Sequence, residues 1–371
     1  MIRPRMRRSK ERVLVVGGAG YIGSHVTLHL QRMGLAVAVA DNLSTGRAEA
    51  VAALQQPGKR EPSFFLTDVL SPARLEKTFA AFKPTTVVHL AGLKHVGQSF
   101  KDPDAYWRSN VGGLKNVRDA LDAAECRRII FSSSAAVYGE PRYLPLDEDH
   151  PTAPQSPYAE TKLACEALLR EWSGRSFENR QENRAVVLRY FNPVGYDPYL
   201  AFAPHIHEER APALADAILD VACRRLLALT IFGTDYQTED GTCLRDFVHV
   251  ADVAAAHAGC IEFMGRGRDR FSIYNLGSGR GVTVLNFVRT FERISNFRVP
   301  LHFLPRRKGD IARSWADISK VRREMGWEPK LQIEEICQTI GQLCPEPLIP
   351  RSANVDCQPT IWQPWGAVNA Q

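Results

Sequence analysis

Residues 13–23 read Val-Leu-Val-Val-Gly-Gly-Ala-Gly-Tyr-Ile-Gly, an apolar run followed by glycines at three-residue spacing. Apolar residues then recur at near-helical spacing through residues 22–33, and the pattern stops at Gly34. This order is typical of a strand, a tight turn and a helix. Glycines in such a turn let the backbone approach a pyrophosphate, and the first helical amides bind the anion. The stretch therefore predicts a dinucleotide-binding turn at Gly17, Gly20 and Gly23.

A second apolar run, residues 36–40, ends in Asp41. A carboxylate at this place binds the hydroxyls of an adenosine ribose and repels a 2′-phosphate. The sequence therefore favours NAD over NADP as the cofactor.

Further short apolar runs alternate with longer amphipathic stretches, which is the pattern of repeated βαβ units. We expect strands at residues 63–67, 85–90, 128–131 and 185–188. The predicted fold is an α/β fold with a Rossmann-type, doubly wound parallel sheet. Ligands bind beyond the carboxyl ends of such strands, and polar or glycine residues follow the predicted strands at Asp68, 91–94, 132–134 and 190–193.

Composition limits the remaining possibilities. The chain has 371 residues, a net charge of +6 and eight scattered cysteines without a Cys-x-x-Cys pair. We therefore expect no metal site, no disulfide framework and a reducing cytoplasm. No apolar stretch approaches a membrane span, and the basic residues 1–11 are expected to be a disordered extension rather than a nucleic-acid arm. A helix is expected at residues 332–343, followed by a proline-bearing tail at residues 344–371.

The stretch at residues 156–162 reads Ser-Pro-Tyr-Ala-Glu-Thr-Lys and is typical of a helix start. Tyr158 and Lys162 are four residues apart, so they share a helix face. Beside a nicotinamide cofactor, the ammonium can lower the pKa of the phenol from about 10 toward neutrality, which makes a base for a sugar or alcohol hydroxyl. Tyr-x-x-x-Lys alone also occurs on ordinary helices, so the catalytic interpretation depends on the other motifs.

An ordered series of longer motifs runs from about residue 12 to about residue 343. It includes Gly-Gly-Ala-Gly-Tyr-Ile-Gly-Ser-His (17–25), Asp-Asn-Leu-Ser-Thr-Gly (41–46), Leu-Ala-Gly-Leu-Lys-His-Val-Gly (90–97), Phe-Ser-Ser-Ser-Ala-Ala-Val-Tyr-Gly (131–139), Leu-Arg-Tyr-Phe-Asn-Pro (188–193), Arg-Asp-Phe-Val-His-Val (245–250) and Pro-Arg-Arg-Lys-Gly-Asp (305–310). The series resembles the UDP-glucose 4-epimerases, which are extended short-chain dehydrogenases/reductases.

The resemblance implies reversible epimerisation of a UDP-hexose at C4 through a 4-keto sugar, with tightly held NAD. Tyr158 would be the base, Ser134 would bridge the sugar O4 and the phenol, and Lys162 would bind the nicotinamide ribose. By position match, further cofactor contacts are expected at Tyr21, Ile22, Asp41, Asn42, Leu43, Ser44, Thr45, Gly46, Asp68, Val69, Leu90, Ala91, Gly92, Leu93, Lys94, Asn110 and Phe191. Substrate contacts are expected at Lys94, Ser134, Tyr158, Asn192, Leu214, Thr230, Ile231, Phe232, Arg245, Arg307, Asp310 and Ser314.

The resemblance also implies a division of the chain and a homodimer. Residues 12–190 would form the NAD-binding domain, and residues 191–343 a smaller, interleaved α/β domain for the UDP-sugar. A diphosphate needs cations, and the forked guanidinium of arginine suits its geometry. Arg245 and Arg307 are therefore the candidate ligands of the diphosphate. An ion pair with Asp246 is the alternative for Arg245, and His249 is expected to be structural.

Several related activities remain as alternatives. Dehydratases and decarboxylases carry an acidic residue just after the active-site Ser or Thr, where this chain has Ala135 and Ala136, so simple oxidation and return at C4 is favoured. Another UDP-sugar 4-epimerase, a net oxidoreductase and an NAD-binding regulator stay open. Ala213 stands before Leu214 where many relatives have Asn, and the small Ser314 leaves room for an N-acetyl group. We therefore expect a pocket that admits UDP-N-acetylhexosamines as well as UDP-glucose and UDP-galactose.

Overall fold

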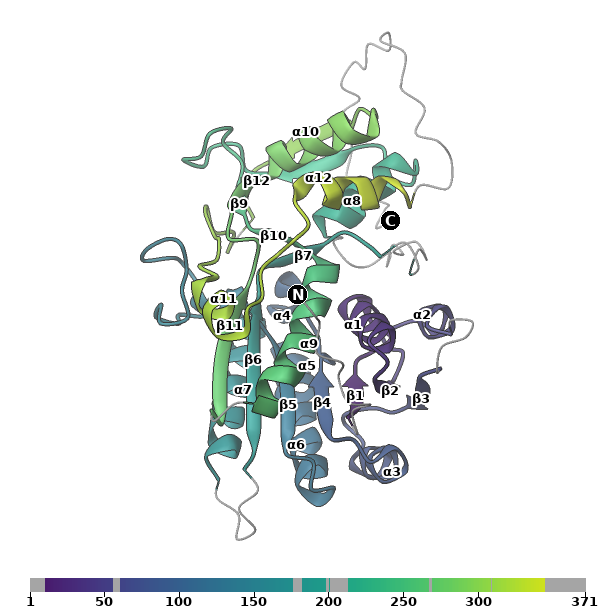
Figure 1. Ribbon diagram of the computed structural model, residues 1–371. Helices are drawn as coiled ribbons and strands as arrows, with labels where there is room; N and C mark the ends of the chain where they lie inside the picture. Colours follow the sequence, from purple (N-terminus) through teal and green to yellow (C-terminus); the bar gives the residue numbers. More distant parts are fainter. Residues whose placement is uncertain are drawn as a thin grey trace, which may run out of the picture.

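Seven parallel strands form the central sheet of the computed structural model, which describes residues 11–55, 61–175, 182–197, 200, 213–266, 269–307 and 309–343. The sheet order reverses at β1, which lies between β2 and β4 (Figure 1). In spatial order the strands are β11 (Phe271–Leu276), β6 (Arg184–Tyr190), β5 (Arg128–Ser134), β4 (Thr86–His89), β1 (Arg12–Val16), β2 (Ala36–Asp41) and β3 (Ser63–Leu66). The predicted doubly wound α/β fold is confirmed.

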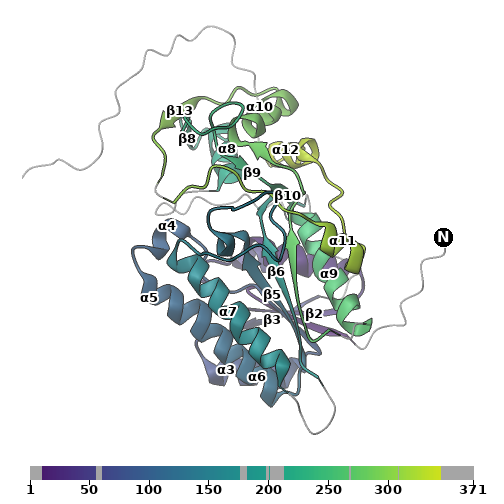
Figure 2. The same cartoon turned by 90° about the vertical axis from the view of Figure 1, so that its left-hand side faces the viewer.

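Helices cover both faces of the sheet because both faces of its central strands are apolar. On one face, α1 (Tyr21–Arg32) and α9 (Val250–Arg266) share a buried core with side chains such as Val15 and Ile130. On the other face, α3 (Pro72–Phe82), α6 (Gly113–Ala123) and α7 (Pro157–Gly174) pack on Leu14 and Phe131 (Figure 2). Alternate residues of each strand thus belong to opposite cores.

Shorter elements connect these layers. They are α2 (Ala48–Ala53), α4 (Val96–Ser99), α5 (Pro103–Tyr106), the π-helix η1 (Trp107–Gly112), the 3-10 helix η2 (Ala135–Tyr138) and α11 (Ser319–Met325).

A smaller α/β region lies beyond the carboxyl ends of the sheet strands (Figure 1). Its core is apolar and includes Ile218, Phe287 and Ile340. Its elements are β7 (Asn192–Val194), α8 (Leu214–Ala222), β8 (Leu229–Phe232), β9 (Leu244–Arg245), β10 (Phe247–His249), β12 (Val282–Thr283), α10 (Val284–Ser295), β13 (Leu301–Leu304) and α12 (Ile333–Gly341). The chain enters this region after β6, returns through α9 and β11, and enters it again, so the two parts are interleaved.

The observed strands differ in length from the expected ones. β5 and β6 are each longer at the carboxyl end, because their pairing continues in register through Ser134 and Tyr190. At the start of β1, Glu11 pairs with Arg128 at 2.8 Å. The expectations for residues 1–10 and 344–371 fall outside the described residues. None of the described helices is long and apolar enough to cross a membrane.

Candidate active site

The glycine-rich turn lies where the sheet order reverses, between the ends of β1 and β4. The amides of Leu90 and Ala91 both donate to the Val16 carbonyl, at 2.8 and 3.0 Å. Gly17 has φ +85°, and a Cβ there would lie 2.5 Å from the Ala91 nitrogen. A Cβ on Gly23 would lie 2.1 Å from the Gly17 oxygen. Only glycine fits these two positions, and the strand ends meet at the edge where dinucleotides bind.

Helix α1 begins at Tyr21, with Gly20 as its N-cap. Glycine has no side chain with which to cap a helix, so the first amides of α1 remain for an anion. The Tyr21 hydroxyl donates to the Gly195 carbonyl at 2.5 Å. Ile22, the next residue of α1, packs against the apolar core between this helix and the sheet. This geometry fits the pyrophosphate of a dinucleotide.

Asp41 ends β2 and is buried beside the same turn. One carboxylate oxygen accepts from the Ala19 amide at 3.0 Å and the other from the Leu43 amide at 2.8 Å. Burial raises the pKa of Asp41, while the backbone hydrogen bonds lower it. A Cβ on Gly46 would lie 2.8 Å from the Asp41 carboxylate. Each oxygen keeps acceptor capacity for a ribose hydroxyl, so the residues fit the adenosine end of NAD.

The other predicted cofactor residues follow the strand ends. The side-chain amide of Asn42 donates to the Asp68 carboxylate at 3.0 Å, and the backbone amide of Ser44 donates to the side-chain oxygen of Asn42 at 3.0 Å. Val69 and Phe191 are buried, whereas the side chains of Thr45 and Lys94 are exposed.

Asn110, in the π-helix η1, uses its side chain to join two segments of the site. Its oxygen accepts from the Leu93 amide at 2.8 Å, and its nitrogen donates to the Leu93 carbonyl at 3.1 Å and to Thr161 at 3.0 Å. A Cβ on Gly92 would lie 2.7 Å from the Asn110 oxygen. Thr161 in turn donates to the Tyr158 carbonyl at 2.7 Å. Asn110 therefore ties the loop after β4 to the helix that carries Tyr158.

The structure brings together the three predicted catalytic residues. Helix α7 begins at Pro157, and the hydroxyl of its N-cap, Ser156, accepts from the Ala159 amide at 3.2 Å. Ser134 accepts from the Ala136 amide at 3.2 Å, and its side chain is close enough to the Tyr158 phenol to lower the pKa of that group. Because the serine oxygen already accepts, its O–H is free to donate to the phenol.

Lys162 lies one turn beyond Tyr158 on α7. Its ammonium donates to the Ser132 carbonyl at 2.8 Å and lies 5.9 Å from the centre of the Tyr158 ring. The ring of Tyr106 meets the Tyr158 ring edge-on, with 6.4 Å between their centres. These contacts place the phenol and the ammonium on one face of the helix, as the sequence predicts.

The net effect of the protein's own groups is to raise the pKa of Tyr158, not to lower it. Burial raises the pKa of this phenol to about 12, and the hydrogen bond to Ser134 acts in the opposite direction. Burial also lowers the pKa of Lys162 to about 8, while Cys165 and Glu166 raise it. The expected fall in the Tyr158 pKa is therefore not a property of the chain's residues alone. The positive charge of an oxidised nicotinamide is the further contribution that would stabilise the phenolate.

Several predicted substrate residues lie together at the end of β8. Arg307 lies 4.6 Å from the centre of the Phe232 ring, and its guanidinium donates to both oxygens of Asp310, at 3.0 and 3.2 Å. Thr230 and Ile231 precede Phe232 in β8, which pairs with β13.

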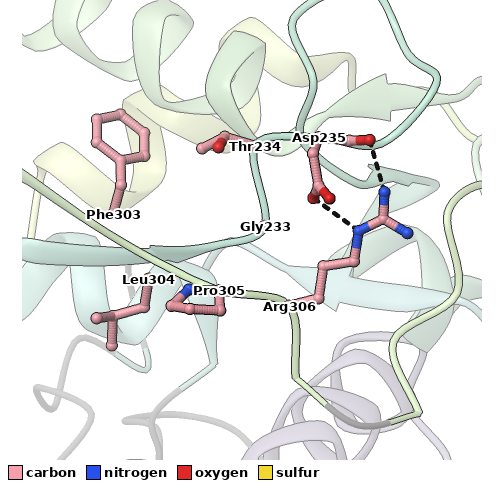
Figure 3. A pocket seen from close by; sticks show the side chains of 7 residues that line it. All are labelled: Gly233, Thr234, Asp235, Phe303, Leu304, Pro305 and Arg306. Atoms are coloured by element: carbon pink, nitrogen blue, oxygen red, sulfur yellow. Dashed lines mark hydrogen bonds and ion pairs between the residues drawn. The ribbon is translucent and has the colours of Figure 1, made fainter.

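A cavity of about 350 Å³ lies beside this group and is lined by Gly233, Thr234, Asp235, Phe303, Leu304, Pro305 and Arg306 (Figure 3). Its two charged side chains face each other, because the Arg306 guanidinium donates to the Asp235 carboxylate at 2.7 Å (Figure 3). This pairing compensates the charge of Arg306, just as the pair with Asp310 compensates that of Arg307.

Arg245 does not form the alternative ion pair with Asp246. Its guanidinium donates to the Leu244 carbonyl at 2.9 Å, and no ion pair involves it within the described part of the chain. Asp246 is fully buried and accepts from Ser278, Gly279 and Ala316 instead. The positive charge of Arg245 therefore remains for a ligand.

Backbone hydrogen bonds bring other predicted substrate residues near Arg245. The Ser314 amide donates to the Leu244 carbonyl at 3.1 Å, and the Asn192 amide donates to the Asp246 carbonyl at 3.0 Å. Leu214 opens α8, and Ala213 before it makes no side-chain cap. The segment that precedes Ala213, residues 201–212, lies outside the described residues. His249 has the expected structural role, since its ring nitrogen accepts from the Ala251 amide at the start of α9.

Sequence reasoning did not identify several residues that organise the site. Two of them, Ser133 and Thr161, lie within the quoted motifs, and Glu166 lies one turn beyond. Their hydrogen-bond partners, however, come from other elements of the fold. The sequence indicates Asp246 only as a possible partner for Arg245. Alternation along residues 131–134 is the signal that could have separated Ser133 from Ser132 and Ser134, because successive strand residues face opposite sides.

Comparison with known proteins identifies the family. The model of the NAD dependent epimerase/dehydratase family matches residues 13–277. The chain belongs to this family. UDP-glucose 4-epimerase 4 from Oryza sativa subsp. japonica is 40% identical over 332 residues, which are 88% of this chain and 88% of the relative. UDP-glucose 4-epimerase from Bacillus subtilis is 39% identical over 330 residues, which are 88% and 94% of the two chains.

A solved structure of a family member has a similar fold. It is UDP-glucose-4-epimerase from Stenotrophomonas maltophila with bound NAD and formylated UDP-arabinopyranose, with a TM-score of 0.84 and 37% identity over 90% of this chain and 97% of the other. The UDP-Glc/GlcNAc 4-epimerase from Campylobacter jejuni has a TM-score of 0.76 and 32% identity, covering 90% of this chain and 98% of the other.

Proposed function

We propose that this protein is a UDP-glucose 4-epimerase that uses tightly bound NAD to interconvert UDP-glucose and UDP-galactose. The observation that carries the proposal is the grouping of Tyr158 and Lys162 with Ser134 and the Ser132 carbonyl at the carboxyl end of β5, in the sheet that also carries the dinucleotide turn. The neighbouring Ala135 and Ala136 supply no second acid or base. The site therefore favours oxidation and return at one carbon over elimination or decarboxylation.

In the proposed mechanism, Ser134 and Tyr158 bind the sugar O4. Tyr158 as phenolate takes the O4 proton during oxidation and returns it during reduction. NAD supplies an acceptor that takes the hydride from C4 and returns it to the other face of the 4-keto sugar. Lys162 holds the nicotinamide ribose and stabilises the phenolate, and Ser134 stabilises it by donating a hydrogen bond. Tyr158 thus handles the proton in both half-reactions.

We propose that residues 12–190 hold NAD and residues 191–343 hold the UDP-sugar. The glycine turn, Asp41, Asn42 and Asp68 support the first assignment, because they form one connected group at the sheet edge. Arg245 and Arg307 would bind the diphosphate. The uncompensated charge of Arg245 and the stacking of Arg307 on Phe232 support this second assignment.

We also propose that the sugar pocket admits N-acetylated UDP-hexoses. Ser314 is small, and its amide is fixed to Leu244 beside Arg245, so its side chain takes little space next to the proposed diphosphate site. The Campylobacter jejuni relative is named a UDP-Glc/GlcNAc 4-epimerase, which supports the same breadth in this chain.

A homodimer and a cytoplasmic location complete the proposal. The homodimer follows from the family resemblance. Size-exclusion chromatography with light scattering, which gives the mass of the eluting particle, checks it. The cytoplasmic location is supported by five buried cysteines that carry free thiols, which is typical of a reducing compartment; they are Cys126, Cys165, Cys243, Cys260 and Cys337.

The experiment follows UDP-galactose and UDP-GlcNAc separately with purified protein and no added NAD. Wild-type protein should epimerise both, and Tyr158→Phe should lose about 10²- to 10⁴-fold in kcat, the contribution of a positioned base. Equal activity of the two proteins on UDP-galactose would refute Tyr158 as the base. Activity only with added NAD and net NADH formation would support an oxidoreductase, and turnover of UDP-galactose without turnover of UDP-GlcNAc would refute the wider pocket.

A further inference from the structure

Three consecutive serines end β5, and each has a different partner. The Ser132 carbonyl accepts from Lys162 at 2.8 Å, and the Ser134 side chain lies beside the Tyr158 phenol, whose pKa it lowers. Between them, Ser133 is buried and donates to the Glu166 carboxylate at 2.5 Å. Ser133 therefore lies between the two points at which β5 meets the catalytic side chains, yet it contacts neither of them.

Glu166 lies on α7, one turn beyond Lys162, and binds two strands at once. Besides Ser133 it accepts from the Arg189 guanidinium at 3.0 Å and 2.7 Å, one bond to each carboxylate oxygen. Both side chains of the pair are almost inaccessible, at 5% and 4% exposed. Arg189 is the direct neighbour of Ser133 across β5 and β6, so one carboxylate of the helix holds adjacent positions on two strands.

A buried ion pair of this kind is weak evidence for stability, because apolar side chains of similar size often serve a core as well or better. The pair has a geometric consequence instead. Tyr158 and Lys162 lie on α7, whereas their partners Ser134 and Ser132 lie on β5, so both contacts depend on how the helix sits along the strand. Glu166 fixes that position next to both contacts.

We propose that Ser133, Glu166 and Arg189, the Ser133 clasp, are positioning residues of the epimerase site. The clasp holds α7 against β5 so that Ser134 meets the Tyr158 phenol and the Ser132 carbonyl meets the Lys162 ammonium. This inference rests on the proposed function and assigns a role to three residues that contact neither sugar nor cofactor.

The test uses Ser133→Ala, which removes one hydroxyl and keeps the Glu166–Arg189 pair. We expect kcat for UDP-galactose to fall about tenfold, which equals about 1.4 kcal/mol in the barrier, while KM changes less than about twofold, since the diphosphate ligands are elsewhere. The acidic limb of the kcat profile should move to higher pH, because the Ser134 hydrogen bond that lowers the Tyr158 pKa is held less well.

Ser173→Ala is the matched control. Ser173 is equally buried on α7, but its hydroxyl donates to the Arg170 carbonyl at the other end of the helix. This variant should keep the wild-type kcat and pH profile.

A second variant, Glu166→Met/Arg189→Met, removes both charges together and so leaves no unpaired buried ion. It should fold and lose at least as much kcat as Ser133→Ala. If either folded variant keeps the wild-type kcat and pH profile, the clasp is overturned while the proposed function stays intact. A tenfold loss of kcat in Ser133→Ala with an unchanged pH profile would overturn it in the same way. If the wild type itself does not epimerise UDP-galactose, the clasp fails together with the proposed function.

Discussion

Replacing Asp246 by Asn is expected to destabilise the protein and to weaken binding of the UDP-sugar. Asp246 is fully buried, and its two oxygens accept four hydrogen bonds. One oxygen accepts from the amide and the hydroxyl of Ser278, at 2.5 and 2.7 Å. The other accepts from the amides of Gly279 and Ala316, at 3.1 and 3.0 Å. The carboxylate therefore holds together three segments next to Arg245 and Ser314.

The magnitude follows from the geometry. An asparagine NH₂ cannot accept, so the better of its two orientations turns the NH₂ toward Ser278, whose hydroxyl can rotate to accept, and leaves one amide unpaired. An unpaired buried N–H costs about 1–3 kcal/mol, and the remaining bonds lose their charge assistance. Burial raises the pKa of Asp246, because it disfavours the charged carboxylate. The neutral asparagine avoids that cost and so recovers part of the lost free energy. We expect a net loss of about 2–4 kcal/mol in the free energy of unfolding.

The control is Asp252→Asn, another buried carboxylate that holds backbone amides. Both of its partners, the amides of Lys330 and Leu331, bind the same oxygen at 3.0 Å, so an asparagine oxygen can keep both bonds. We expect this variant to lose no more than about 1 kcal/mol.

The assay measures urea unfolding and the KM for UDP-galactose of both variants. In Asp246→Asn, the KM should rise about tenfold, equal to about 1.4 kcal/mol of binding, because the backbone that carries Arg245 is released on one side. The KM of Asp252→Asn should stay at the wild-type value. Equal stability losses in the two variants, or an unchanged KM in Asp246→Asn, would refute the reasoning.

Two further predictions concern single charges. Arg245→Ala should raise the KM for UDP-galactose at least tenfold, since a charge-assisted bond contributes about 1.5–3 kcal/mol, whereas Arg306→Ala should leave it almost unchanged; equal effects would contradict the assignment. Lys162→Met should be inactive but more stable than the wild type below pH 8, because the pKa of Lys162 is lowered to about 8 by burial. Between pH 8 and the usual Lys pKa of about 10.4, the unfolded wild-type chain binds more protons than the folded chain, so its free energy of unfolding rises with pH. The stability advantage of Lys162→Met over the wild type therefore shrinks by about 1.4 kcal/mol per pH unit in this range. A pH-independent difference in urea unfolding would contradict the lowered pKa.

Much of the fold could be predicted from short stretches of sequence. The glycine turn follows from the backbone itself, because Gly17 must adopt positive φ and leave space for Ala91. The alternation of apolar strands and amphipathic helices is likewise a local pattern. Strand ends were less predictable, because β5 and β6 extend as far as their mutual pairing allows, and pairing joins residues far apart in the chain.

The sequence by itself determined the chemical groups: the dinucleotide turn, Asp41, and Tyr158 and Lys162 at helical spacing. Only the tertiary structure decided how those groups are held and charged. The return of the chain through β11, the bridge from Glu166 to Ser133 and Arg189, and the four bonds of Asp246 all join separate elements. The pKa of Tyr158 depends on its burial under many such elements. Local spacing specifies which atoms are present, whereas long-range packing specifies their solvation and position, on which their reactivity depends.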